Sequence, residues 1–371
     1  MNYQKNNNYY NPVKIIETDN WINEIKLIID SKNLNNLLII TSKGNNKRIN
    51  IQNYFQNTII LDDVPPNPTI QYCDSKLSSL RSHNFDSIIA VGGGSVMDAA
   101  KLFLAGISLK EKTTLELIEY KKNIKSNVLS FFVPTTHGTG SEVTMWGTIW
   151  DLENTKKYSI SNLGLYPNYA LLDFKLAESL TVNLSIITSM DALSHSLESI
   201  WNKNKSSKTV KYAIESIILI INNTKEIHKK SISKKNRKNL IYASTLAGLA
   251  FSNTKTAICH SISYPLTMMY NIPHGVASSM TLIPILIQSE NEIKDELQII
   301  YDKLKINNLS EFIKIIQNIY NSKISYNLKD WGVKKKDIPS LVKKCYTKDR
   351  IGNYIFDLKE KDILKILNTI Y

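Results

Sequence analysis

The stretch that decides the fold is "DSIIAVGGGSVMDAAK", residues 86–101. It begins with an apolar run typical of a buried strand, continues with Gly92, Gly93 and Gly94, and then enters a segment with a helical period at Ser95. Glycines let the backbone approach a ligand closely, and the free N–H groups at a helix start favour an anion. This order therefore predicts a phosphate cradle for a dinucleotide, although the same glycines also fit a simple tight turn.

Residues 86–101 belong to a longer alternation of strand and helix patterns. Short apolar runs rich in β-branched or aromatic residues predict strands at 37–40, 57–61, 86–91, 128–133 and 169–173. Segments with a helical period lie among them at 21–31, 75–83 and 95–106. Because this alternation is typical of βαβ units, we expect an α/β domain with a mainly parallel sheet and helices on both faces.

The pattern changes near residue 178. Long amphipathic segments without strand-like alternation follow at 185–201, 208–229, 236–254, 258–270, 275–288, 290–304, 309–321, 336–346 and 360–370. A chain of 371 residues is also longer than one hydrophobic core usually supports. The sequence therefore predicts an α/β dinucleotide-binding domain over residues 1–178 and an all-α metal- and substrate-binding domain over residues 179–371.

The composition, with 43% hydrophobic and 21% charged residues, is that of an ordinary globular protein. No apolar run approaches the roughly 20 residues that span a bilayer, and the N-terminal residues lack the apolar core of a secretory signal. The three cysteines are widely separated, which indicates neither a disulfide framework nor a Cys-rich zinc site. We therefore expect a cytoplasmic protein with no membrane partner.

The formal net charge of +13 raises the question of a nucleic-acid partner. The lysines are scattered through the chain, and we interpret the densest basic run, "HKKSISKKNRK" at 228–238, as a solvated connection between two helices. We therefore expect no nucleic-acid partner. A basic binding protein without catalysis is the less favoured alternative to an enzyme.

A second loop, "VPTTHGTGSE" at 133–142, follows another buried strand and is rich in small hydroxyl residues and glycines. Two such loops at neighbouring strand ends can hold both halves of a dinucleotide at the crevice of a parallel sheet. His137 lies within this loop, and we interpret it as a solvent-facing or locally hydrogen-bonded residue rather than a catalytic one.

Two stretches suggest a metal site, "SMDALSHSLESIW" at 189–201 and "AICHSISYPLTMMYNIPHG" at 257–275. Asp191 and His195 are four residues apart, so both side chains leave the same face of a helix. Together with His260 and His274 they offer one carboxylate and three imidazoles, a donor set that suits a divalent transition metal such as Fe(II) or Zn(II). The same spacing also fits histidines that are hydrogen-bonded in a core, and four protein ligands leave room for a substrate only in an expanded coordination shell.

These motifs, "GGGSVMDAAK", "PTTHGTGSEVT", "DALSHSLE" and "CHSISYPL…NIPHG", resemble in order and separation those of the iron-dependent (group III) alcohol dehydrogenases, over roughly residues 30–290. The resemblance implies an N-terminal dinucleotide domain, a helical C-terminal domain, a site in the cleft between them, and a homodimer. It places the metal ligands at Asp191, His195, His260 and His274. It places the cofactor-binding residues at Gly92, Gly93, Gly94, Ser95, Asp98, Thr135, Thr136, Gly138, Ser141 and Lys157.

Tyr264 departs from the family pattern. Many members have there a second histidine, four residues after the third metal ligand, that is proposed to relay protons. A phenol with an ordinary pKa near 10 is a weaker acid–base group near neutral pH than an imidazole. We therefore expect Tyr264 to pack in the pocket or contact the substrate, with proton delivery through the cofactor ribose or water, and the role of proton donor stays open.

Lys255 suggests the charge of the substrate. It lies five residues before His260, between Thr254 and Thr256, where its ammonium group could reach the site. A cation beside a metal is unfavourable unless an anion shares the space, which points to an anionic substrate. The alternative is that Lys255 faces solvent.

Three further segments, 141–160, 198–204 and 260–267, resemble the phosphonoacetaldehyde reductases of phosphonate biosynthesis. That branch implies NAD(P)H-linked reduction of phosphonoacetaldehyde to 2-hydroxyethylphosphonate, with Lys255 on the phosphonate and Trp146 excluding water. The alternative on the same scaffold is a general primary-alcohol or diol dehydrogenase of the butanol or 1,3-propanediol type.

Ser42 bears on the choice of cofactor. It follows the strand predicted at 37–40, where NAD-preferring members often carry an acidic residue that repels a 2′-phosphate. With Ser42 at this position and Lys43 and Arg48 nearby, we expect NADPH to be tolerated, and NADH stays open.

Overall fold

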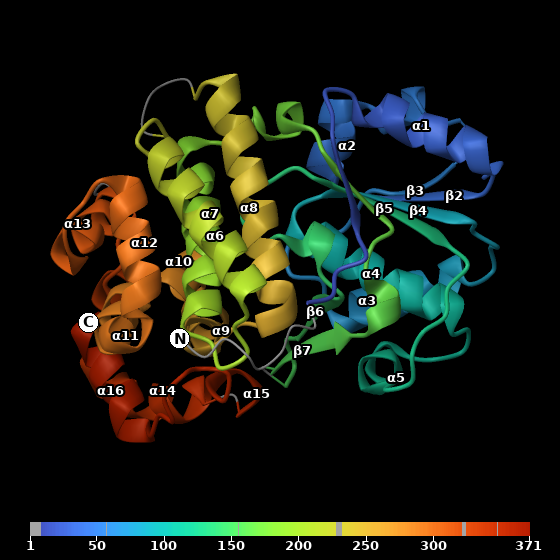
Figure 1. The fold of residues 1–371 in the computed structure, drawn as a ribbon. Helices are drawn as coiled ribbons and strands as arrows, with labels where there is room; N and C mark the ends of the chain where they lie inside the picture. The colour runs from blue at the N-terminus through green and yellow to red at the C-terminus, as the bar shows by residue number, and fades with distance from the viewer. Residues whose placement is uncertain (1–8, 57, 155, 228–231, 321–323, 347) are drawn as a thin grey trace. The chain divides into compact units, whose positions relative to one another are not determined.

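The computed structural model describes residues 9–56, 58–154, 156–227, 232–320, 324–346 and 348–371. They form two compact units (Figure 1). The α/β unit consists of Asn11–Thr136 and Ser141–Glu178. The helical unit consists of His137–Gly140 and Ser179–Tyr371, together with the described residues before Asn11.

The α/β unit is built on a parallel sheet whose strand order is β1-β8-β5-β4-β2-β3. Its strands are β1 (Lys14–Glu17), β2 (Leu37–Ile40), β3 (Ile59–Leu61), β4 (Ser87–Gly92), β5 (Leu129–Pro134) and β8 (Tyr169–Leu172). Its helices are α1 (Trp21–Lys32), α2 (Lys43–Ile49), α3 (Ile70–Leu80), α4 (Gly94–Ser108) and α5 (Thr114–Glu119). The predicted class, a parallel sheet with covering helices, is confirmed, while β1 was not predicted.

The central strands are apolar along their whole length because helices cover both faces of the sheet. Leu38 and Ile40 of β2 belong to one core with residues of α3 and α4. Leu37 and Ile39 belong to the opposite core, with residues of α1. The continuous run at 37–40 therefore buries alternate side chains on opposite faces.

An antiparallel hairpin joins β6 (Trp146–Asp151) and β7 (Lys156–Ser161), and the sequence analysis did not predict it. The hairpin lies against α4, because Asp98 accepts a hydrogen bond from the Thr148 backbone N–H at 2.9 Å. Gly147 permits this approach, since a Cβ there would lie 2.8 Å from the Asp98 carbonyl oxygen. Trp146, which was expected to exclude water from the substrate, is thus the first residue of a β-strand.

The helical unit contains a succession of helices whose starts carry hydroxyl caps. Thr181, Ser206 and Ser233 each accept a backbone N–H at the start of α6, α7 and α8. The helices are α6 (Val182–Ile200), α7 (Ser207–Thr224), α8 (Lys234–Thr254), α9 (Ile258–Tyr270), α10 (His274–Ser279), α11 (Leu282–Ser289), α12 (Lys294–Leu304), α13 (Leu309–Tyr320), α14 (Ile338–Cys345), α15 (Lys348–Ile351) and α16 (Glu360–Thr369). Short 3-10 turns lie at Ile51–Asn53, Ser141–Val143, Leu163–Leu165, Phe174–Ala177, Glu290–Ile293, Leu328–Trp331 and Lys335–Asp337.

The interpretation of 228–238 as a solvated connection is wrong for its second half. Residues 228–231 lie outside the described residues, but α8 begins at Lys234. Arg237 is only 5% exposed and donates hydrogen bonds to Ser185 Oγ at 2.7 Å and the Leu180 carbonyl oxygen at 2.9 Å. The single segment predicted at 275–288 is also wrong, because it forms two helices, α10 and α11.

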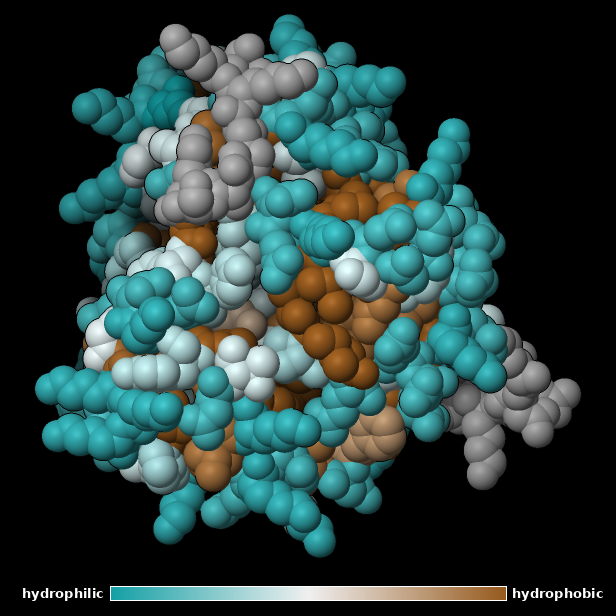
Figure 2. Space-filling view, turned by 90° about the vertical axis from the view of Figure 1, so that its left-hand side faces the viewer, coloured by the Kyte–Doolittle hydropathy of each residue, from teal (hydrophilic) through white to brown (hydrophobic). Residues whose placement is uncertain are grey.

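Hydrophilic side chains surround smaller apolar patches on the face shown in Figure 2. Within the described part of the chain, no helix combines the length and the apolar character needed to cross a bilayer.

Candidate metal centre

Helix α6 presents Asp191 and His195 on one face, because residues four apart lie above one another on a helix. His260 lies in the first turn of α9. All three side chains are buried, and each offers one ligand atom within 4.8 Å of the others. The structure therefore brings three of the four predicted ligands into one cluster.

The donor atoms of this cluster fit a metal ion. His260 Nε2 lies 3.8 Å from Asp191 Oδ1, which is beyond an ordinary hydrogen bond. The rings of His195 and His260 are stacked with their centroids 4.4 Å apart. Nδ1 of His195 is buried and has no hydrogen-bond partner among the described residues, which points to a ligand that the chain itself does not supply. Imidazole and carboxylate donors suit a divalent transition metal.

His274 opens helix α10 and lies beside the cluster, although it is not one of the three residues grouped within 4.8 Å. Its ring centroid is 5.4 Å from that of His260, in an edge-on arrangement. Gly275 lets α10 approach α6, since a Cβ there would lie 2.3 Å from the Ile187 carbonyl oxygen and 3.1 Å from Asp191 Cβ. The role of His274 as fourth ligand stays a prediction.

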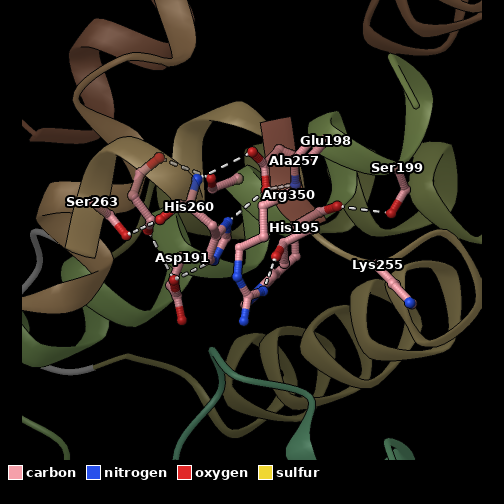
Figure 3. A network of polar contacts seen from close by, with 12 residues as sticks. Asp191, His195, Glu198, Ser199, Lys255, Ala257, His260, Ser263 and Arg350 are labelled. Atoms are coloured by element: carbon pink, nitrogen blue, oxygen red, sulfur yellow. Dashed lines mark hydrogen bonds and ion pairs between the residues drawn. The ribbon is translucent and has the colours of Figure 1, made fainter. Parts of the chain in front are cut away.

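Glu198 orients His260, and the sequence analysis missed this role although the residue ends the quoted motif "DALSHSLE". Its fully buried carboxylate lies 2.6 Å from Nδ1 of His260 (Figure 3). It also accepts the backbone N–H groups of Ala257 and His260, at 3.0 and 3.2 Å, and so binds the start of α9. With Nδ1–H donating to the carboxylate, Nε2 of His260 is left as the metal-binding nitrogen.

Burial raises the pKa of Glu198, while the backbone N–H groups of Ala257 and His260 oppose the rise. The signal that could have identified this residue is its spacing: Glu198 lies three residues after His195 and therefore near the same face of α6.

Tyr264 lies one turn after His260 in α9, with its ring stacked 6.3 Å from the ring of His274. Burial is the main cause that raises the pKa of Tyr264 to about 12. The phenol therefore keeps its proton near neutral pH and is a poor acid. Its expected role in packing or substrate contact stays a prediction. The guanidinium of Arg350, which the sequence analysis did not single out, lies 4.9 Å from the centroid of this ring.

Lys255 is not brought together with the metal ligands. It follows α8, its side chain is exposed, and Figure 3 shows it apart from Asp191, His195 and His260. Its backbone has φ 63°, a left-handed value that non-glycine residues rarely adopt. The proposed contact between Lys255 and an anionic substrate therefore stays a prediction.

The glycine loop of the α/β unit has the predicted form. Gly92 ends β4, Gly93 caps α4, and Gly94 is the first residue of that helix. A Cβ on Gly92 would lie 2.5 Å from Val96 Cβ, so the tight turn requires glycine. Ser95 Oγ accepts the backbone N–H of Asn67 at 3.1 Å.

A buried network links α4 to the second loop. Asp98 accepts the Ser141 hydroxyl at 3.0 Å. The fully buried ammonium of Lys101 donates to the Ser141 carbonyl and hydroxyl oxygens, the Thr144 hydroxyl and the Trp146 carbonyl, at 2.7 to 2.9 Å. Burial lowers the pKa of Lys101 to about 8. Lys101, which the sequence analysis missed, therefore fixes the start of the hairpin.

Most of the other predicted cofactor-binding residues also lie in the α/β unit. Thr135 follows β5 and donates its N–H to the Gly92 carbonyl at 3.0 Å, which joins the two loops. Ser42 caps α2, and Lys157 lies over the ring of Trp150 at 5.1 Å. The side chain of Thr136 lies beside the glycine loop, since a Cβ on Gly93 would be 3.3 Å from it.

Two residues of the second loop belong to the helical unit instead. Gly138 lies against α6, where a Cβ would be 2.9 Å from the Thr188 carbonyl oxygen. His137 is buried, and its Nδ1 lies 3.2 Å from the Thr188 hydroxyl. Burial lowers the pKa of His137 to about 3, so the ring is neutral and locally bonded, as expected.

Comparison with known proteins decides the family. The model for iron-containing alcohol dehydrogenase matches residues 12–174, and the model for the C-terminal part of the Fe-containing alcohol dehydrogenase family matches residues 185–371. The chain belongs to the iron-containing alcohol dehydrogenase family. This membership and the ligand cluster support a metal site and NAD(H) binding.

Named relatives of the chain include alcohol dehydrogenases of two bacteria. The NADPH-dependent butanol dehydrogenase of Clostridium saccharobutylicum is 32% identical over 60% of this chain and 58% of that protein. The long-chain primary alcohol dehydrogenase AdhA of Thermoanaerobacter ethanolicus is 26% identical over 94% of this chain and 92% of its own length.

Solved structures share the fold. The sulfoacetaldehyde reductase of Bifidobacterium kashiwanohense in complex with NAD+ is 23% identical, covers 98% of each chain and has a TM-score of 0.88. A 1,3-propanediol oxidoreductase is 24% identical, covers 98% of this chain and 99% of its own, and has a TM-score of 0.89. At these identities the likeness shows the fold alone.

Replacing Glu198 tests the orientation of His260. Glu198→Gln removes the charge that accepts Nδ1–H, so metal affinity should fall by about 10- to 100-fold in competition with a chromophoric chelator. The exposed Glu215→Gln on α7 is the matched control and should leave affinity unchanged. Equal affinities for both variants would contradict this role.

Gly275→Ala tests the close approach of α10 to α6. Because the new Cβ meets backbone, the variant should lose about 1–3 kcal/mol of unfolding free energy and bind less metal per chain. Gly44→Ala serves as the control, since a Cβ at Gly44 meets no atom within 4 Å. Denaturant unfolding and metal analysis measure both effects, and similar behaviour of the two variants would refute the packing argument.

Lys101→Met tests the anchor of the second loop. The variant leaves several buried acceptors without their donor, so stability should fall by about 2–4 kcal/mol and NADH should bind more weakly. The exposed Lys110→Met is the control for the loss of a lysine charge. Thermal unfolding and NADH fluorescence titration report the two effects, and NADH affinity unchanged in Lys101→Met would exclude a role in shaping the cofactor loop.

Proposed function

We propose that the protein is a metal-dependent, NAD(P)H-linked reductase that converts a small anionic aldehyde, most specifically phosphonoacetaldehyde, to its primary alcohol. The observation that carries the metal-dependent part is the gathering of Asp191, His195 and His260 donor atoms within 4.8 Å, in a chain of the iron-containing alcohol dehydrogenase family. The phosphonoacetaldehyde part rests on the sequence resemblance to that branch.

The ligand cluster would hold Fe(II) or Zn(II), with His274 as the fourth protein ligand. When bound, the metal supplies a Lewis acid for the carbonyl oxygen and the reduced nicotinamide supplies the hydride. Glu198 keeps Nε2 of His260 directed at the metal position, because its carboxylate accepts the proton on Nδ1. The burial of Asp191, His195 and His260 excludes water and strengthens electrostatic interactions at the site.

The cofactor would bind along the α/β unit. Gly93 and Gly94 open α4, so the free N–H groups and positive end of this helix favour the pyrophosphate of a dinucleotide. Ser42 stands after β2 in place of an acidic residue, and Lys43 is next to it, which supports tolerance of the 2′-phosphate of NADPH. Trp146 is proposed to shield the reacting carbonyl from water.

Proton delivery is assigned to water or the cofactor ribose. Tyr264 holds its proton too tightly for this work, since its pKa is raised to about 12, and we propose that its ring shapes the pocket beside His274. A homodimer in the cytoplasm remains the expected state, and sedimentation velocity measures the oligomer.

A general primary-alcohol or diol dehydrogenase is the second candidate. It is favoured by the names of the relatives, which include the butanol dehydrogenase and the 1,3-propanediol dehydrogenase of Citrobacter freundii, 28% identical over 85% of this chain. The less favoured alternative, a binding protein without catalysis, has no support, because the chain belongs to a family of alcohol dehydrogenases.

A reductase assay separates these candidates. Metal-free protein reloaded with Fe(II) or Zn(II) should oxidise NADPH or NADH faster with phosphonoacetaldehyde than with butyraldehyde, by at least about tenfold in kcat/KM. His195→Ala should lose activity and metal together. Equal or better turnover of butyraldehyde would favour the general dehydrogenase, and no turnover with any aldehyde would contradict the proposed function.

A further inference from the structure

Arg350 lies close to the metal cluster, and neither the sequence motifs nor the family assignment gives it a role. Its guanidinium lies 4.9 Å from the ring centroid of Tyr264, which is itself stacked 6.3 Å from His274. In the view of Figure 3 the side chain extends toward the level of Asp191 and His195, whereas Lys255 lies apart. The positive charge of Arg350 therefore lies next to Tyr264, and the ring of Tyr264 lies next to His274, a predicted metal ligand.

Hydrogen bonds fix both the guanidinium of Arg350 and the chain segment that carries it. Its Nη1 donates to the hydroxyl of Thr256 at 2.7 Å, and Thr256 is buried just before α9. Asn353, three residues later, donates its side-chain amide to the Thr256 carbonyl at 2.9 Å. The Asn353 carbonyl accepts the backbone N–H of Lys203 at 2.8 Å. The segment that carries Arg350 is thus bonded to the chain just after the end of α6 and just before the start of α9, which limits the side-chain entropy lost on binding.

We propose that Arg350, positioned by the Thr256 hydroxyl, forms the subsite that binds the anionic group of the substrate, a phosphonate or a similar oxyanion on the carbon next to the aldehyde. This rests on the proposed function. A planar guanidinium binds oxyanions through paired N–H groups, and its charge does not depend on pH in the physiological range. The buried Thr256 hydroxyl accepts Nη1 of Arg350 and so fixes one edge of the guanidinium. Arg350 replaces Lys255 as the cation in the account of an anionic substrate.

The charges at the site favour this role. With a divalent metal bound, the negative charges of the buried Asp191 and Glu198 carboxylates are balanced. A further cation at Arg350 is then unfavourable unless an anion shares the space next to Tyr264. Arg350 is only partly buried, so this cation does not carry the full desolvation cost of a core arginine. An uncharged aldehyde gains nothing from this arrangement.

The test compares Arg350→Met and Arg350→Lys with Lys255→Met, and uses the exposed Lys343→Met as the control for loss of a positive charge. Each variant is assayed as metal-loaded enzyme on phosphonoacetaldehyde and on butyraldehyde. Affinity for the product 2-hydroxyethylphosphonate is measured by calorimetry, which does not depend on turnover. Metal content is determined for each preparation.

Arg350→Met should lower the ratio of kcat/KM for phosphonoacetaldehyde to that for butyraldehyde by about 10- to 100-fold, mainly through KM, and should weaken product binding to a similar extent. Arg350→Lys should recover part of the kcat/KM ratio and part of the product affinity, because an ammonium keeps the charge without the paired N–H geometry. Lys343→Met should change neither.

Equal losses on both aldehydes in Arg350→Met would mean that Arg350 only packs against Tyr264, and would overturn the proposal. A selective loss in Lys255→Met with no selective loss in Arg350→Met would assign the anion to Lys255 and would also overturn it. If the wild-type enzyme turns over butyraldehyde but neither turns over phosphonoacetaldehyde nor binds the product, the anionic substrate itself is wrong. If it turns over no aldehyde, the proposed function fails independently of Arg350.

Discussion

The metal centre depends on one buried hydrogen bond, between the Glu198 carboxylate and Nδ1 of His260, at 2.6 Å. The same carboxylate binds the backbone N–H groups at the start of α9, so one residue fixes both the ring nitrogen that faces Asp191 and the position of the helix that carries the ring. Without the Nδ1–H of His260, the buried Glu198 carboxylate would keep only its backbone N–H partners at the start of α9.

Close packing brings the remaining parts of the site to this interaction. Gly275 allows α10 to lie against α6, which places His274 next to His260. Tyr264 then fills the space between the imidazoles and Arg350. In the α/β unit, the buried ammonium of Lys101 holds α4 against the loop that begins the hairpin, through hydrogen bonds to that loop. Gly275 and the buried charged side chains of Glu198 and Lys101 thus hold the elements of the two units in contact within each unit.

Local patterns predicted much of the fold and of the ligand set. The strand, glycine loop and helix at 86–101 and the bounds of α9 follow from periodicity, and the Asp191–His195 pair follows from helical spacing. The β6–β7 hairpin was missed because Trp146–Asp151 and Lys156–Ser161 show weak alternation, and α8 began earlier than its basic composition suggested because Ser233 caps it. Glu198, Lys101 and Arg350 act through contacts with residues distant in the sequence, which spacing alone does not reveal.

The most direct test of the central claim is a crystal structure of the metal-loaded protein with anomalous data collected at the absorption edges of iron and zinc. The account predicts one metal ion per chain, bound by Asp191 and by Nε2 of His260 together with His195 and His274, with Glu198 still accepting the proton on Nδ1. A metal bound directly by Glu198, or an anomalous peak away from these residues, would contradict it.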